Sequence, residues 1–251
     1  MIEYHFKIII PFYNVEKWIQ MCLKSVQLQT YKNFQCIVID DISTDNSHNA
    51  AQAMIKNDDR FVLIKNKEKA YALKNIHDAI NTASPAKNDI IVSLDGDDWF
   101  ANNKVLETLN NKYNETDCWM TYGSYVEYPS GIEGKFAKQI PDYIIENRSY
   151  RESEWMTSHL RTFKHALWEK IDKNDFIFSQ TNKFVKAAWD LAFVFPMLEM
   201  SGKKALYISD VLYVYNRGNP LNEDKVDHPL QLSEEQEMRN KTKYKLQETL
   251  E

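Results

Sequence analysis

The sequence has few cysteines and no long apolar run. These two features limit the cellular compartment that we expect and exclude a predicted membrane helix. Its three cysteines among 251 residues are odd in number and lack metal-ligand spacing, so we expect free thiols in a reducing compartment. No segment approaches the roughly 18 uninterrupted apolar residues of a membrane helix. The N-terminus also lacks the apolar core and small-residue cleavage site of a secretion signal. We therefore expect a cytoplasmic protein without an integral membrane segment.

The chain also lacks an excess of positive charge. Its 31 Lys and Arg residues and 36 Asp and Glu residues leave a net charge of −5. No global basic field would therefore attract nucleic acid or an anionic membrane, and we do not expect nucleic acid as a partner. With 43% hydrophobic and 27% charged residues, the composition is that of an ordinary globular chain, long enough for one large domain or two small lobes.

The first half of the chain contains an alternation of apolar strands and helical segments. Strands are predicted over residues 6–11, 34–39, 61–64 and 90–94, and helices over residues 15–29, 47–54 and 71–81. Apolar strands separated by helices indicate a mostly parallel, Rossmann-like central sheet flanked by helices on both faces. The sequence therefore predicts the α/β class.

The second half follows a different pattern, without a linker rich in Pro, Gly or Ser. Its predicted elements are a strand at 119–127, a turn at 128–135, a helical region at 152–171, a helix at 186–200, a strand at 205–215 and a loosely packed helical tail at 232–251. We expect two halves of one domain, residues 1–115 and 116–228, followed by a helical tail at 229–251.

Polar residues gather where the predicted strands end. They occupy residues 11–14, 40–47 and 95–98, which should converge because ligands bind at the carboxyl ends of parallel strands. Asp95 and Asp97 can share one face across Gly96, and their hard oxygen ligands suit Mg²⁺ or Mn²⁺. The alternative is an ordinary acidic turn after a strand.

These segments carry a resemblance to a known family. Residues 7–14 (KIIIPFYN), 37–47 (IVIDDISTDNS) and 94–98 (LDGDD) resemble, in order and spacing, the three signatures of family 2 glycosyltransferases. The similarity is strong over about the first 115 residues and weak afterwards. It implies a GT-A fold with an acceptor-side C-terminal half. It also implies an inverting, Mn²⁺- or Mg²⁺-dependent transfer of a sugar from a UDP-linked or other nucleotide-sugar donor to a hydroxyl of a glycan, lipid-linked or protein acceptor.

The resemblance implies roles for residues of the first half. Tyr13 would offer its ring to the nucleotide base while Pro11 shapes the loop; the alternative is a turn aromatic that packs on the lobe, and we favour the base contact. Asp41 would accept a hydrogen bond from the base imide N–H, which selects uracil or thymine. Asp95 would approach the ribose or a metal-bound water, and Asp97 would ligate the metal.

The chain departs from the family in its third strand–helix unit. The family commonly has a Gly followed by an Ala-Arg-Asn-like triplet, whereas residues 69–75 read KAYALKN. Lys74 replaces the Arg, which keeps a cation for phosphate but loses the planar fork; an exposed helix lysine is the alternative. Without the Gly, the loop near residue 69 should have a different backbone shape.

The catalytic base should come from the second half, because inversion requires a carboxylate on the acceptor side. Asp190 resembles the Asp of the family's Glu-Asp-like motif, although Trp189 replaces the acidic neighbour. The alternative is a helix-start residue stabilised by the helix dipole. Arg161, with His159 and Lys164 nearby, would contact the sugar or diphosphate unless these residues form a polar helix face.

Two other classes of function remain open. A nucleotidyltransferase would share the sheet, metal and nucleotide, but it should show a Gly-rich loop with a basic residue after the first strand, and this chain has none there. A catalytically degenerate nucleotide-sugar or carbohydrate-binding module would bind without turnover, and release of UDP distinguishes it from an enzyme. Asp98 has no single predicted role, and His228 would either close over the metal site or be exposed.

Overall fold

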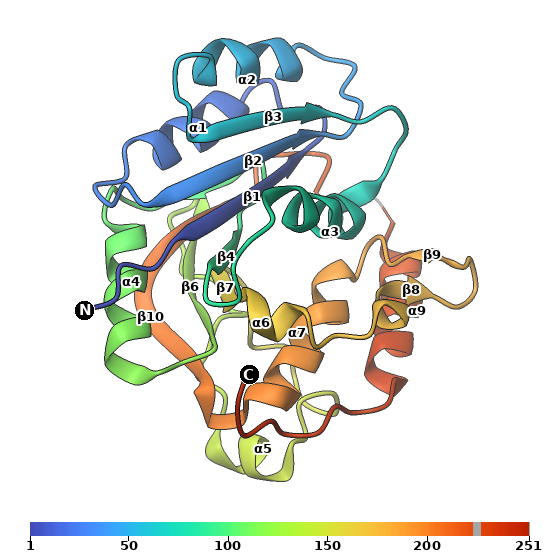
Figure 1. Cartoon of the computed structure of the whole chain (residues 1–251). Coiled ribbons are helices and arrows are strands. Elements are labelled where there is room, and N and C mark those ends of the chain that lie inside the picture. Colours follow the sequence, from blue (N-terminus) through green and yellow to red (C-terminus); the bar gives the residue numbers. More distant parts are fainter. Residues whose placement is uncertain (223–226, 251) are drawn as a thin grey trace.

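The computed structural model describes residues 1–222 and 227–250, and its main feature is one eight-stranded sheet (Figure 1). From edge to edge the strands are β3 (Phe61–Lys65), β2 (Phe34–Asp40), β1 (Phe6–Phe12), β4 (Ile90–Ser93), β7 (Arg161–Lys164), β6 (Met120–Tyr128), β10 (Ala205–Asn216) and β5 (Trp99–Phe100). The first four run parallel, and β6 is parallel to β10. The short strand β7 is antiparallel to both of its neighbours, and β5 is antiparallel to β10.

Strands β1, β2 and β4 are mostly apolar, as expected where both faces of a sheet are covered. Successive side chains of a strand point to opposite faces, so Ile8 and Ile10 pack in one apolar cluster while Ile9 packs in the other. The first cluster includes side chains of α1 (Ile19–Gln27), α2 (Ser47–Ile55) and α4 (Val105–Thr116). The second includes side chains of α3 (Tyr71–Ala83), α6 (His165–Trp168) and α7 (Trp189–Ser201). Figure 1 shows α1 and α2 on one side of β1–β3 and α3 on the other.

The predicted α/β class is confirmed, and so are the strands and helices predicted for the first half. Boundaries shift by a few residues; the helix expected at 15–29, for example, is α1 and begins at Ile19. In the second half, the strands predicted at 119–127 and 205–215 are β6 and β10. The helix predicted at 186–200 is α7, and Asp190 is its second residue.

The prediction of a helical region at 152–171 is wrong. Residues Arg161–Lys164 form β7, in the middle of the sheet, and only the short α6 that follows is helical. β7 fills the space between β4 and β6, so the backbone groups of both neighbours find hydrogen-bond partners. The polar side chains are buried rather than exposed: Thr162 contacts the hydroxyls of Tyr113 and Thr121 at 2.9 and 2.6 Å.

The prediction of a loosely packed helical tail is also wrong. The last helix is α9 (His228–Asn240), which begins earlier than expected, and residues 241–250 follow it without forming a helix. Glu234 and Met238 of α9 are buried, and the ammonium group of Lys241 donates to three backbone carbonyls of residues 174–177. Buried side chains and these hydrogen bonds, which the sequence pattern does not reveal, hold this segment on the domain.

Smaller elements complete the second half. They are α5 (Asp142–Asn147), the 3₁₀ turns η1 (Lys173–Phe176) and η2 (Gly202–Lys204), and a hairpin of β8 (Ile177–Phe178) and β9 (Lys183–Phe184). Cys22, Cys36 and Cys118 are buried free thiols, as expected. Within residues 1–222 and 227–250, no helix combines the length and the apolar character needed to cross a membrane.

Candidate active site

A cavity of about 420 Å³ lies at the carboxyl ends of β1, β2 and β4. The three polar segments that were predicted to converge all contribute to its lining, so that prediction is confirmed. Much of the rest comes from residues before and at the start of α7, from the end of β10 and the described residues after it, and from α9. These are Lys186, Ala187, Trp189, Asp190, Tyr215, Asn219, Leu221, Asn222, Asp227 and Gln231. The cavity therefore lies between loops of the first half and elements of the second half.

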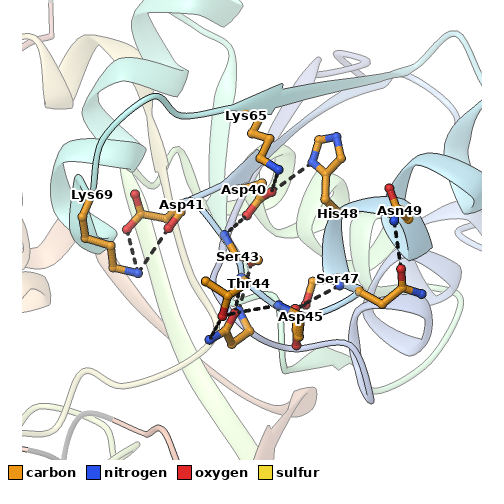
Figure 2. A network of polar contacts seen from close by, with 12 residues as sticks. Asp40, Asp41, Ser43, Thr44, Asp45, Ser47, His48, Asn49, Lys65 and Lys69 are labelled. Carbon is orange, nitrogen blue, oxygen red and sulfur yellow. Dashed lines mark hydrogen bonds and ion pairs between the residues drawn. The ribbon is translucent and has the colours of Figure 1, made fainter.

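Polar contacts join the loops after β1 and β2 (Figure 2). Asn14 has a left-handed backbone conformation, with φ 52°, and its Oδ1 accepts from the Thr44 backbone N–H at 2.8 Å. The hydroxyl oxygen of Ser43 accepts from the Asn14 backbone N–H at 3.0 Å. The buried Asp40 accepts from the Ser43 N–H at 2.7 Å and lies 3.0 Å from His48 Nδ1. Asp40 therefore shapes the loop, and its neighbour Asp41 points to the other side.

Asp41 is held by four donors. Its Oδ1 accepts from the Asn66 amide and the Ala70 backbone N–H, each at 2.8 Å, and its Oδ2 accepts from the Tyr71 backbone N–H at 2.9 Å. The ammonium group of Lys69 lies 3.2 Å from Oδ2. Burial alone would raise the pKa of Asp41, but these hydrogen bonds and the Lys69 charge together lower it. A base imide would have to replace one of these donors, and the base contact stays a prediction.

The start of α3 shows how the chain manages without the family's Gly. Tyr71, its first residue, has φ 62°, a conformation that costs a residue with a Cβ about 1–3 kcal/mol. The hydrogen bond to Asp41 holds this conformation in place. Tyr71 thus adopts a conformation that glycine reaches without strain, and the predicted difference in loop shape near residue 69 stays a prediction.

Two lysines line the cavity that the sequence analysis did not select. The ammonium group of Lys69 lies 2.9 Å from the ring centroid of Tyr13, and that of Lys186 lies 4.7 Å from the ring centroid of Tyr71. By contrast, the ammonium group of Lys74 lies 2.5 Å from Asp78, and Lys74 is not part of the lining. Its phosphate contact stays a prediction. The spacing of the family motif selects Lys74, whereas Lys69 and Lys186 reach the cavity through the fold.

The acidic loop after β4 is packed against the end of β1. A Cβ on Gly96 would lie 2.4 Å from Phe12 Cβ, so this position requires glycine. The loop is also tied to β10, because Asp98 accepts from the Tyr213 hydroxyl at 2.6 Å and from the Asn216 backbone N–H at 2.7 Å. Residues of β10, more than one hundred positions along the chain, thus fix the orientation of the Asp98 carboxylate.

Carboxylates crowd the floor of the cavity. Burial, the first cause, and the nearby charge of Asp97 raise the pKa of Asp95 to about 7; Asp190 adds to this effect and Arg161 opposes it. Burial and the charges of Asp97 and Asp95 also raise the pKa of Asp98. Arg161 Nη1 donates to Asp190 Oδ2 at 2.6 Å, so this buried guanidinium partly balances the cluster. A cation bound here would relieve the remaining repulsion.

Three side chains of the described residues could hold such a cation. Asp95, Asp98 and His159 each offer a ligand atom, and these atoms lie within 4.8 Å of one another. Burial, then the charge of Arg161, lowers the pKa of His159 well below its ordinary value, so the ring is neutral as a metal ligand must be. The two carboxylates are the hard oxygen ligands that suit Mn²⁺ or Mg²⁺, whereas an imidazole is not a typical ligand of Mg²⁺. Asp97 is not one of the three, and its role as a ligand stays a prediction.

Most of the predicted site residues line the cavity. They are Pro11, Tyr13, Asp41, Asp95, Asp97, Asp98, His159, Arg161 and Asp190. Lys164 lies elsewhere, 3.6 Å from Asp117, and His228 is an exposed residue at the start of α9. The sequence analysis missed Asn219, whose amide donates to Asp97 Oδ2 at 2.6 Å, and Gln231 of α9. No motif marks either residue.

Comparison with known proteins agrees with this arrangement. The chain matches the model of glycosyl transferase family 2 over residues 7–190. It is 29% identical over 222 residues to glycosyltransferase GlyG of Streptococcus pneumoniae, covering 84% of this chain and 70% of that protein. It is also 36% identical over 151 residues to the UDP-Glc:alpha-D-GlcNAc-diphosphoundecaprenol beta-1,3-glucosyltransferase WfgD of Escherichia coli, covering 59% of this chain and 56% of that protein.

Among solved structures, Staphylococcus aureus TarS in complex with UDP-GlcNAc has a similar fold. The TM-score is 0.68 at 18% identity, with 88% of this chain and 61% of the TarS chain covered. The chain therefore spans less than two thirds of TarS and of WfgD. Since the family model covers most of the sequence, the chain belongs to glycosyltransferase family 2 and is an inverting glycosyltransferase of the GT-A fold that uses a nucleotide-sugar donor.

Proposed function

We propose that this protein transfers a hexose from a UDP-linked donor to a hydroxyl of a lipid-linked glycan, in the cytoplasm and with bound Mn²⁺ or Mg²⁺. WfgD and a Campylobacter jejuni relative are both named as glucosyltransferases that act on diphosphoundecaprenol- or PP-undecaprenol-linked sugars, and WfgD is named with UDP-Glc. The buried free cysteines support a reducing compartment. The alternative to a lipid-linked acceptor is a glycan or protein that carries no lipid.

One observation carries the proposal: an acidic cluster, with the Arg161 guanidinium beside Asp190, faces a cavity built from both halves of the chain. We assign residues 1–115 to donor binding, residues 116–228 to acceptor binding, and residues 229–251 to a C-terminal tail. On the donor side, Tyr13 would contact the base next to Pro11, and Asp95 and Asp97 would lie near the ribose and diphosphate. Lys69 and Lys186 would add positive charge toward the phosphates.

Asp190 is our candidate for the base. Its side chain lines the cavity and retains 24% of its accessible surface, while Arg161 holds Oδ2 and thereby orients the carboxylate. The carboxylate would take the proton of the acceptor hydroxyl as that oxygen bonds to the anomeric carbon. The bond to the nucleotide diphosphate breaks in the same step, and its electron pair leaves with the diphosphate.

A divalent ion would be held by Asp95, Asp98 and His159, with Asp97 nearby. When bound, it supplies charge neutralisation for the leaving diphosphate. These three residues fit this task, because their ligand atoms lie within 4.8 Å of one another. Burial, and then the charge of Asp97, raises the pKa of Asp95, so a bound cation would stabilise its ionised form. Asp98 would have to share its oxygens between the ion and its donors Tyr213 and Asn216.

Asp190→Asn tests the assignment of the base. With UDP-hexoses, Mn²⁺ and lipid-linked glycan acceptors, UDP release by this variant should fall by about 10²–10⁴ in kcat, because the amide cannot take the proton. Donor affinity, measured by calorimetry, should change little. Asp210→Asn, an exposed change on β10, serves as the matched control.

The same assay separates the other possibilities. Near-normal kcat in Asp190→Asn removes Asp190 as the base, and lost donor binding places it in the donor subsite. Metal-dependent UDP binding by the unaltered protein without any turnover would support a degenerate binding module. Equal stabilisation by ADP and UDP would contradict the proposed uracil selectivity.

A further inference from the structure

We propose that Glu234 of α9 is a positioning residue that holds the start of α7, and with it Asp190, at the acceptor side of the cavity. The inference rests on the proposed function, in which Asp190 is the base. It extends that function to the C-terminal segment, which lies beyond the residues matched by the family model. Glu234 does not line the cavity, so its effect would pass through the backbone of residues 186–190.

Glu234 binds three consecutive backbone N–H groups ahead of α7. Its Oε1 accepts from Lys186 at 2.9 Å, and its Oε2 accepts from Ala187 at 2.6 Å and Ala188 at 3.0 Å. The residue is 1% exposed, so its carboxylate is shielded from water, and both of its oxygens accept hydrogen bonds from one short stretch of backbone. Such charge-assisted bonds are roughly twice as strong as neutral ones.

The start of α7 needs this outside partner. The first N–H groups of a helix have no acceptor within the helix, and a Ser, Thr, Asp or Asn at the N-cap normally supplies one. Here the N-cap is Ala188, whose side chain has no oxygen. Glu234, from a helix almost fifty residues away, accepts instead from the N–H of Ala188 and of the two residues ahead of it, so it fixes how the chain enters α7. Its negative charge suits the positive end of the α7 dipole.

The stretch that Glu234 holds is part of the cavity wall. Lys186, Ala187, Trp189 and Asp190 all line the cavity, so a shift of this backbone would move the candidate base directly. The opposite side of Asp190 is fixed by Arg161 from the centre of the sheet. Arg161 therefore orients the carboxylate, and Glu234 sets where its backbone lies.

The same helix offers a matched control. Glu237, one turn after Glu234, accepts from the Ser179 backbone N–H at 2.9 Å and from its hydroxyl at 2.6 Å. This contact also joins α9 to backbone of the second half, but Ser179 is in the β8–β9 turn and neither residue lines the cavity. Glu237→Gln therefore removes a similar anchor without touching residues 186–190.

The test compares Glu234→Gln with Glu237→Gln and combines the first with Asp190→Asn. The amide of Gln keeps the size of the side chain but turns an NH₂ group toward a backbone donor. We expect kcat for UDP release to fall about 10- to 100-fold in Glu234→Gln, the loss typical of a small misplacement of a reacting group, and to stay unchanged in Glu237→Gln. In the double variant Asp190→Asn/Glu234→Gln, the rate should be no lower than in Asp190→Asn alone.

Independent losses that multiply in the double variant would overturn the proposal, because Glu234 would then act other than through Asp190. A drop in melting temperature with normal kcat in Glu234→Gln would do the same, since that is the result of a purely structural role. If Glu234→Gln does not fold, Glu234→Asp keeps the charge and shortens its reach, and the same comparison is made with that variant.

Amide hydrogen exchange separates this inference from the proposed function. If the unaltered protein shows no turnover, the proposed function fails, but Glu234→Gln should still speed exchange at residues 186–190 and leave Ser179 unchanged. Glu237→Gln should show the reverse pattern. Unchanged exchange at residues 186–190 in Glu234→Gln would overturn the positioning role by itself.

Discussion

The adjacent carboxylates of Asp40 and Asp41, at the end of β2, have different roles in the structure. Asp40 closes its own loop through Ser43 and His48, whereas Asp41 reaches across to the start of α3. Because Asp41 stabilises a left-handed Tyr71, it matters for stability as well as for any contact with the donor. A motif residue can thus serve structure and binding at once.

Asp41→Asn should destabilise the protein by about 2 kcal/mol at pH 7, because an NH₂ group would replace an acceptor oxygen among four donors. The folded-state pKa of Asp41 is lowered, so its contribution is fully present above the unfolded pKa and is lost as the pH falls through the folded pKa. Urea unfolding should therefore give the same difference at pH 7 and pH 5, and a smaller one below about pH 4. A difference that vanishes between pH 7 and pH 5 would contradict this account.

At the scale of elements, α7 is the centre of the second half. Nearly all its residues are buried, and it carries Asp190 at one end and Glu199 near the other. Arg151 donates to both oxygens of Glu199, at 2.6 and 2.9 Å, and the Tyr244 backbone N–H adds a third bond at 2.9 Å. The backbone carbonyl of Met238 in α9 accepts from the same arginine. The ion pair therefore fastens α7 to the C-terminal segment.

Glu199→Ala should cost about 3–5 kcal/mol of unfolding free energy, because it leaves the buried Arg151 without its partner. Glu146→Ala is the control: it removes the exposed partner of Lys203, and surface pairs of this kind contribute little. Chemical denaturation of both variants measures the contrast. Equal losses in the two variants would show that the ion pair does not support the contact between α7 and the tail.

At the scale of the whole molecule, the two halves meet at the acidic cluster, and ligands should couple them. Mn²⁺ with UDP should raise the unfolding free energy by RT ln(1 + [L]/Kd), about 2.7 kcal/mol at 100 times Kd. EDTA should reverse this gain. Asp95→Asn should raise the Kd for Mn²⁺ more than tenfold, because it removes one of three candidate ligands. Asp210→Asn should leave this Kd unchanged. Equal stabilisation of Asp95→Asn and the unaltered protein by Mn²⁺ would remove Asp95 from the metal site.

The sequence by itself determined most of the fold of the first half of the protein. Apolar strands, helical spacings of apolar residues and turns follow one another within a few positions there, so the local pattern predicts the α/β order. Polar residues at the ends of three parallel strands must then converge, as Tyr13, Asp41 and Asp95 do. These local rules also placed Asp190 at the start of a helix.

Only the tertiary structure decided the rest, because the deciding contacts join distant residues. Arg161 belongs to a four-residue strand, too short for a periodic pattern, and the free edges of β4 and β6 set its conformation. Glu234 belongs to a charged helix, whose sequence pattern is typical of a solvent-exposed helix. It is buried because α9 packs beside the backbone N–H groups ahead of α7, which need an acceptor. Spacing along the chain cannot reveal such partners, since folding alone brings them within hydrogen-bond distance.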